Sequence, residues 1–182
     1  HEFQQVYDRL GVTLTECGES FYNPLIPGAI DELTKLGLVK EDQGMLITML
    51  PHFTIPLILR KSDGGYGYDS TDMAALQYRI FDRKADWIIY ITDAGQEGHF
   101  HMCFDAGKAA GWTEKVRLDH IGFGVVCGDD GKRFKTRSGA TIALTSLLDE
   151  AKVRMSDSLH ARKAEGKTTL TDEEIDSAAT KI

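Results

Sequence analysis

Three glycine-containing segments carry the polar side chains that could bind a small molecule: KSDGGYGYDSTD at 61–72, TDAGQEGHF at 92–100 and HIGFG at 120–124. The glycines of the first segment would let its backbone approach a ligand closely. Tyr68 and Asp72 are four residues apart and would face the same side of a helix that starts in this segment. The second segment adds Asp93, Gln96 and His99. These side chains together offer donors and acceptors for a polar or charged ligand.

Each segment also has an ordinary structural explanation. Residues 61–72 could be a solvated surface loop followed by a capped helix, and Gln96 and His99 could be exposed residues of a first helical turn. The basic run KRFKTR at 132–137 could be a charged hairpin. His99 and His101 are two residues apart and would point in different directions on a helix, which disfavours a shared metal ion. Local features alone leave both interpretations open.

Three known motifs are matched only in part, and all three are rejected. Residues 122–127 have a cysteine where the dinucleotide-binding fingerprint needs its third glycine. Gly131-Lys132-Arg133 resembles the end of a phosphate-binding loop. That motif needs a glycine five positions before Gly131, which is missing, and a serine or threonine where Arg133 stands. Residues 129–131 lack the alternating ligands of a calcium loop. The sequence therefore predicts no metal site.

The composition fits one globular domain, with 182 residues of which 42% are hydrophobic and 27% charged. No apolar run is long enough to span a membrane. The three cysteines form no CxxC pair, which favours the reducing cytoplasm over a disulfide framework. The net charge of −7 argues against a domain that binds nucleic acid by itself and suits a small cationic ligand. The first residues lack the layout of a signal peptide and begin inside an amphipathic pattern, which suggests a fragment.

Hydrophobic periodicity predicts the elements that would position these segments. Helices are expected at 3–10, 28–36, 71–83, 97–110, 145–164 and from 171 to the last residue, and strands at 12–14, 45–50, 55–60, 87–92 and 116–126. Gly11, Gly37 and Gly111 would end three of the helices. Ser70 or Thr71 is expected to cap the helix at 71–83. The last helix would begin with the capping box TDEE at 171–174.

The order of elements from 55 to 126 predicts an α/β fold. Strands and helices alternate there with short connections, which implies a parallel sheet with right-handed crossovers. The strand WIIYIT at 87–92 is continuously apolar, as expected for a strand covered on both faces. Ligands of such sheets bind beyond the carboxyl ends of the strands, where the three glycine-containing segments lie.

The segments, taken in order, resemble one enzyme family. KSDGGYGYDSTDMAALQYR at 61–79, IIYITDAGQEGHFHM at 88–102, HIGFGVVCGDDGKRFKTRSG at 120–139 and LLDEA at 147–151 resemble arginyl-tRNA synthetases, which are class I aminoacyl-tRNA synthetases. FQQVYDRLGV at 3–12 and GESFYNP at 18–24 fit the stretch upstream, so the resemblance covers nearly the whole chain. It implies a Rossmann-like nucleotide-binding fold that activates L-arginine with ATP and Mg²⁺ and transfers it to tRNA(Arg). Association with other synthetases is left open.

The resemblance assigns four residues to the arginine pocket. They are Tyr68, Asp72, Gln96 and, through the GES segment, Glu19. The chemistry agrees with this assignment, because a guanidinium is a permanently charged planar fork of donors that fixed carboxylates can bind at two points.

The resemblance assigns a second group to ATP: Asp93, Gly95, His99, His120, Gly122, Phe123 and Gly124. The segment KRFKTRSG at 132–139 takes the place of the mobile KMSKS loop of class I synthetases but departs from its pattern. Lys135 and Arg137 are the residues expected to act in catalysis, by stabilising charge on the phosphates.

The resemblance also implies how the chain divides. Residues 1–144 would be the second half of the catalytic domain, and 145–182 a helical segment that leads to an anticodon-binding domain. The HIGH signature of class I synthetases is absent, so the chain alone is expected to be inactive. Two alternatives remain: a non-catalytic arginine- or nucleotide-binding module of the same fold, and a class I synthetase for another amino acid.

Overall fold

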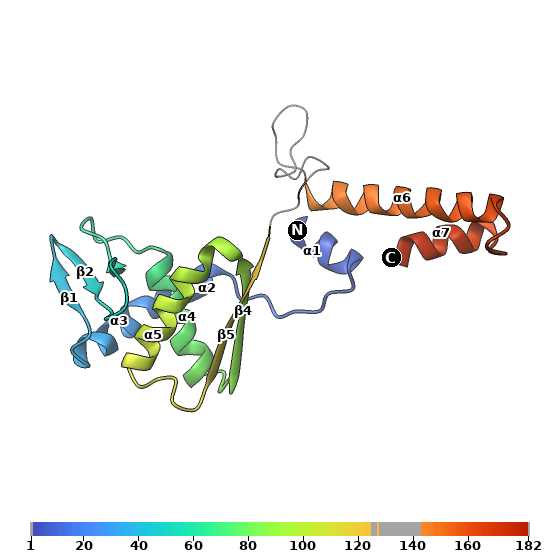
Figure 1. Ribbon diagram of the computed structural model, residues 1–182. Coiled ribbons are helices and arrows are strands. Elements are labelled where there is room, and N and C mark those ends of the chain that lie inside the picture. Colours follow the sequence, from blue (N-terminus) through green and yellow to red (C-terminus); the bar gives the residue numbers. More distant parts are fainter. Residues whose placement is uncertain (1, 125–126, 128–142, 182) are drawn as a thin grey trace. The chain divides into compact units, whose positions relative to one another are not determined.

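The computed structural model describes residues 2–124, 127 and 143–181 (Figure 1). The chain divides into one unit that spans Glu16–Val125 and a second that joins His1–Thr15 to Val126–Ile182. The basic segment at 132–139, which includes Lys135 and Arg137, lies outside the described residues.

The first unit begins with helices, continues with three successive strands, and alternates strands with helices only from the third of these onward (Figure 1). Its elements are α2 (Glu19–Tyr22), η1 (Asn23–Leu25), α3 (Ile26–Lys35), β1 (Lys40–Asp42), β2 (Met45–Thr48), β3 (Leu57–Arg60), α4 (Tyr68–Phe81), β4 (Trp87–Asp93), η2 (Ala94–Gln96), α5 (Glu97–Ala109) and β5 (Arg117–Phe123). The fold class predicted from the sequence, α/β, is confirmed.

The strands form two sheets, and one prediction about them is wrong. β4 and β5 are parallel neighbours joined through α5, as predicted. β3 was expected in the same parallel sheet, but it pairs antiparallel with β2, which also pairs antiparallel with β1. The two-residue turn Gln43-Gly44, whose φ angles of 48° and 79° suit a tight hairpin, joins β1 to β2. β3 follows β2 after the short connection 49–56, which lets the chain turn back and add β3 antiparallel to the other edge of β2.

The described chain covers only one face of β4, although its apolar run predicted two covered faces. Ile88 and Tyr90 are buried, whereas Trp87, Ile89 and Ile91 are exposed by 42% to 65%. The predicted strand at 12–14 is also not formed, because those residues have no strand partner among the described residues.

The core of the first unit lies where α3 and α4 pack with β3 and α5. Its fully buried side chains are Ile26, Leu33, Leu57, Leu59, Met73 and Leu76. Gly107 permits the close approach of α5 to α4, because a Cβ atom there would lie 2.8 Å from Cδ2 of Leu76. The packing fixes the two helices that carry most of the polar side chains of the site.

Helix α4 begins three residues earlier than predicted. Gly67 is its extended N-cap residue. The Ser70 hydroxyl accepts a hydrogen bond from the Gly67 N–H at 3.3 Å and donates one to the Leu59 carbonyl at 2.7 Å. Ser70 is therefore a third helical residue that bonds back to the cap and ties the helix to β3. The earlier start places Tyr68 and Asp72 on the helix itself.

The described residues of the second unit form three helices, α1 (Glu2–Arg9), α6 (Leu144–Ala164) and α7 (Asp172–Lys181). The predicted capping box is confirmed by hydrogen bonds of 2.8 Å and 3.2 Å between Thr171 and Glu174. Arg9 pairs with Asp149 at 2.7 Å, which links α1 to α6. Within the described part of the chain, no helix is both long and apolar enough to cross a membrane. The functional boundary predicted at residue 144 remains a prediction.

Candidate functional site

Four predicted site residues line one pocket of about 300 Å³ in the first unit. Glu19 comes from α2, Tyr68 and Asp72 come from the first two turns of α4, and Gln96 comes from the end of η2. These residues are up to 77 positions apart in the sequence, from Glu19 to Gln96. The fold therefore brings together the whole set that the sequence assigned to an arginine pocket.

Gln96 is positioned by a short capped turn after β4. The Asp93 carboxylate accepts a hydrogen bond from the Gly95 N–H at 2.8 Å and so starts η2, which ends at Gln96. Helix α5 follows at once. Asp93 and Gly95 thus have a local structural role at the carboxyl end of the strand.

One wall of the pocket is aromatic and holds a cation. The Arg79 guanidinium lies 5.6 Å from the ring centre of Tyr22 and 5.0 Å from that of Tyr90. These distances allow cation–π attraction on both sides. Burial raises the pKa of Tyr90 to about 12, against the lowering effect of Arg79. The phenol therefore stays neutral at physiological pH, and the positive charge of Arg79 lies at the pocket.

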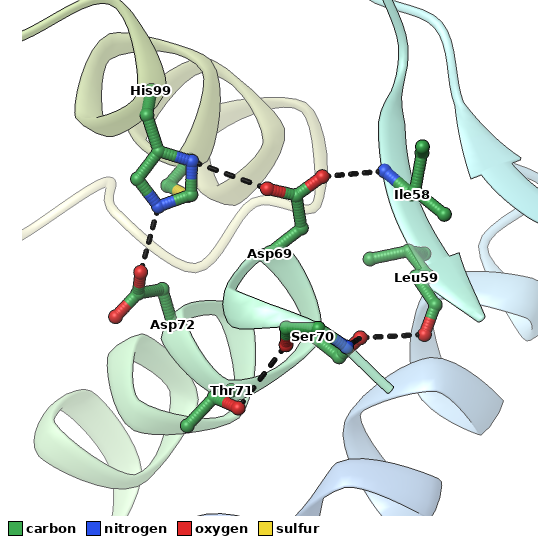
Figure 2. A network of polar contacts seen from close by, with 9 residues as sticks. Ile58, Leu59, Asp69, Ser70, Thr71, Asp72 and His99 are labelled. Atoms are coloured by element: carbon green, nitrogen blue, oxygen red, sulfur yellow. Dashed lines mark hydrogen bonds and ion pairs between the residues drawn. The ribbon is translucent and has the colours of Figure 1, made fainter. Parts of the chain in front are cut away.

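A polar network lies beside the pocket (Figure 2). Nε2 of His99 is 2.6 Å from Oδ2 of Asp72, and Nδ1 of His99 is 3.3 Å from Oδ1 of Asp69. The other oxygen of Asp69 accepts a hydrogen bond of 2.7 Å from the Ile58 N–H. The side chains of His99 and Asp69 are 13% and 12% exposed, and that of Asp72 is 28% exposed.

The carboxylates determine the charge of His99. Burial alone would lower the pKa of His99, but its contacts with Asp69 and Asp72 outweigh burial and raise that pKa to about 12. The imidazole is therefore a cation at neutral pH, with Nε2 in hydrogen-bond contact with Asp72 and Nδ1 in an ion pair with Asp69. Two carboxylates against one imidazolium leave the network with one negative charge.

The other residues predicted to bind ATP gather at the carboxyl edge of β4 and β5. Asp93 is the register partner of Phe123, and Thr92 that of Gly122. His120 to Phe123 belong to β5, within the predicted strand at 116–126, and only Gly124 lies beyond the end of the strand. Phe123 is 55% exposed.

Two of these residues are explained by local packing. A Cβ atom at Gly122 would lie 2.8 Å from Cα of Ala94, so only glycine lets η2 lie against β5. The His120 ring stacks on Phe100 with centres 5.3 Å apart, and its Nε2 lies 2.8 Å from the Thr92 hydroxyl. Their contact with ATP remains a prediction.

The remaining expectations concern catalysis and metals. Lys135 and Arg137 lie outside the described residues, so their roles stay predictions. Across residues 2–124, 127 and 143–181, no group of three histidine, cysteine or acidic side chains is arranged to hold a metal ion.

Sequence reasoning missed two residues of the site, Asp69 and Arg79. Asp69 lies three residues before Asp72 and Arg79 seven residues after it, so both share its face of α4. This spacing was a usable signal. It became visible only once the start of the helix was known.

The comparisons with known proteins agree with the fold. Residues 1–182 match the family model described as the catalytic domain of class I tRNA synthetases (R). The arginine–tRNA ligase of Thermosynechococcus vestitus is 50% identical over 188 residues, which cover 100% of this chain and 32% of that protein. The cytoplasmic arginine–tRNA ligase of Arabidopsis thaliana is 51% identical over 167 residues, which cover 89% and 28% of the two chains.

A solved structure extends the similarity to three dimensions. Arginyl-tRNA synthetase from Plasmodium falciparum superposes with a TM-score of 0.79 at 34% sequence identity, covering 98% of this chain and 29% of that one. The fold is therefore the Rossmann-like fold of a class I aminoacyl-tRNA synthetase. The chain belongs to the family of arginyl-tRNA synthetase catalytic domains. It spans about a third of the length of the curated relatives that it matches, 28% to 32% for the two named above.

Proposed function

We propose that this chain supplies the arginine-binding part of an arginine–tRNA ligase. The whole enzyme would activate L-arginine with ATP to arginyl-adenylate and then transfer the arginyl group to tRNA(Arg). The observation that carries the proposal is the shared pocket of Glu19, Tyr68, Asp72 and Gln96.

The chemistry of the pocket suits the side chain of arginine. A guanidinium stays charged at every physiological pH and presents its donors in one plane. Carboxylates such as Asp72 and Glu19 can bind it at two points, and Tyr68 provides a ring and a hydroxyl at the pocket mouth. Gln96 offers both a donor and an acceptor to the head group of the amino acid. The pocket therefore favours arginine over neutral amino acids.

The reaction needs positioning rather than a covalent enzyme intermediate. A carboxylate oxygen of arginine attacks the α-phosphorus of ATP, and pyrophosphate leaves. A ribose hydroxyl at the end of the tRNA then attacks the arginyl carbonyl, and AMP leaves. The residues of this chain would bind and orient arginine, so that its carboxylate reaches the nucleotide in a reactive geometry.

ATP would bind at the carboxyl edge of β4 and β5, near Gly95, His120, Gly122 and Gly124. Lys135 and Arg137 would stabilise the charge that develops on the phosphates. Mg²⁺ would accompany the nucleotide. The described residues contain no group of three histidine, cysteine or acidic side chains arranged to hold it. We propose the cytoplasm as the site of action and tRNA(Arg) as the macromolecular partner, with other synthetases as a further possible association.

A chimera tests the proposal directly. The 182 residues would replace the matching segment of the Thermosynechococcus vestitus relative, and arginine-dependent ATP–pyrophosphate exchange and aminoacylation would be measured, both with tRNA(Arg) present, because the family resemblance implies that activation needs bound tRNA. We expect both activities. Calorimetric binding of L-arginine together with a folded but inactive chimera would instead favour a non-catalytic arginine-binding module. Exchange that depends on another amino acid would reject arginine as the substrate.

A further inference from the structure

The carboxylate of Asp72 is held by a chain of contacts that crosses three elements (Figure 2). The Ile58 N–H of β3 donates to Asp69 at 2.7 Å. Asp69 pairs with His99 of α5 at 3.3 Å, and His99 contacts Oδ2 of Asp72 at 2.6 Å. Asp69 and Asp72 are both on α4, so His99 bridges two successive turns of the neighbouring helix. These contacts link the backbone of strand β3 to the Asp72 carboxylate, which lines the pocket.

The imidazole of His99, at the centre of these contacts, is itself held in place. Its ring lies edge-on to Tyr68 at 4.8 Å and to Phe100 at 5.0 Å, measured between ring centres. Nδ1 of His99 and Oδ1 of Asp69 are buried and have no hydrogen-bond partner other than the ion pair that they form together. A ring that contacts two aromatic rings and has a carboxylate at each nitrogen cannot turn freely, so it determines the orientation of the Asp72 carboxylate.

We infer that His99, anchored by Asp69, is a positioning residue that sets the plane of the Asp72 carboxylate for two-point binding of a guanidinium. This inference rests on the proposed function. It differs from the expectation that His99 contacts ATP, because both of its polar atoms are already engaged by carboxylates. His99 itself does not need to touch arginine.

Orientation matters for a planar ligand and much less for a spherical one. A guanidinium gains its two parallel hydrogen bonds only when the carboxylate lies in its plane, whereas the ammonium of lysine is a point charge. The charge of His99 repels both cations. Loss of that charge therefore changes the binding of arginine and lysine together, and loss of orientation weakens the binding of arginine alone. The ratio of the two affinities separates the effects.

The experiment uses the chimera that carries the whole 182-residue chain. The KM for L-arginine and the inhibition constant of L-lysine would be measured by ATP–pyrophosphate exchange for the wild type, His99→Leu and His99→Gln. We expect His99→Leu to lower the preference for arginine over lysine at least tenfold. His99→Gln keeps a donor toward Asp72 and should lower it less. The KM for ATP should change less than twofold.

Two further variants make the test specific. His101→Gln changes an exposed histidine on the same helix and should leave the ratio within twofold. In an Asp72→Asn background, His99→Leu should alter the ratio less than twofold, because the residue that His99 positions is already changed. A purely structural role would reduce the amount of folded enzyme and leave the ratio unchanged.

The outcomes are distinct. A wild-type chimera without arginine-dependent exchange overturns the proposed function and this inference with it. An active wild type whose His99→Leu variant keeps the ratio, or changes the KM for ATP instead, overturns the inference alone. If His99→Leu does not fold, His99→Gln decides the question. Its preference for arginine over lysine must be lower than that of the wild type, and an unchanged preference overturns the inference.

Discussion

Replacing Asp72 by alanine is the most direct perturbation of the pocket. The change removes the carboxylate that lies 2.6 Å from His99 and lines the cavity. Two consequences follow for a bound guanidinium. Its two-point partner is lost, and the imidazolium of His99 keeps only Asp69 as a counter-charge.

The size of the effect follows from the environment of the carboxylate. Removing one partner of a buried charge pair costs about 3–5 kcal/mol. The Asp72 side chain is 28% exposed, and the solvent that reaches it screens part of the interaction, which favours the lower end of that range. About 3 kcal/mol corresponds to a loss of roughly 100-fold in kcat/KM for arginine.

The assay is steady-state ATP–pyrophosphate exchange in the chimera, with citrulline as the neutral analogue. The Asp72→Ala variant should discriminate less between arginine and citrulline. Asp82→Ala alters an exposed aspartate at the other end of the same helix and should change kcat/KM less than twofold. An Asp72→Ala enzyme with unchanged arginine kinetics would show that the carboxylate does not face the substrate.

Three more predictions concern stability and the chain alone. His99 has a pKa raised from 6.5 to about 12, so its stabilising effect is complete below pH 6.5 and declines as pH rises toward 12. The stability advantage of the wild type over His99→Gln, measured by urea unfolding, should fall between pH 7 and 9 with a slope of at most about 1.4 kcal/mol per pH unit; a constant difference would contradict the assigned charge. Gly122→Ala places a Cβ atom 2.8 Å from the Ala94 backbone and should cost about 1–3 kcal/mol. Gly98→Ala meets nothing within 4 Å and should be neutral or stabilising; equal Tm values for these two variants would argue against a tight contact at Gly122. The isolated 182-residue chain should show no arginine-dependent pyrophosphate exchange, and exchange at the rate of a complete enzyme would refute this.

Periodicity and glycines located the helices well but could not identify the partners of the strands. The predicted helix at 97–110 is α5, Glu97–Ala109, because a regular apolar face and Gly111 define it locally. β3 was assigned to the wrong sheet, since an apolar run is compatible with any neighbour. The two-residue turn at Gln43-Gly44 signals only the hairpin of β1 and β2, and the edge of β2 that pairs with β3 has no comparable local signal.

The site was predicted as a set of residues, and its internal geometry was not. The family resemblance assigned Tyr68, Asp72 and Gln96 to one pocket, and they line one pocket. The anchoring of Asp69 could not be predicted, because Asp69 accepts a hydrogen bond from the Ile58 N–H of β3. The sequence analysis had placed β3 in the wrong sheet. Tertiary contacts of this kind have no local pattern.

The proposed arginine site contains two cations of its own, Arg79 and the imidazolium of His99, and they bear on how it would select its ligand. Asp69, Asp72 and Glu19 provide three carboxylates, and His99 and Arg79 provide two positive charges, so the group retains one negative charge. A guanidinium neutralises the group, whereas citrulline leaves one negative charge uncompensated. Discrimination between arginine and neutral citrulline would therefore depend on the net charge of all five side chains. Discrimination between the planar guanidinium of arginine and the ammonium of lysine would depend on the orientation of Asp72. A His99→Leu variant makes the group more negative, so it should bind cations in general no less well while its preference for arginine declines.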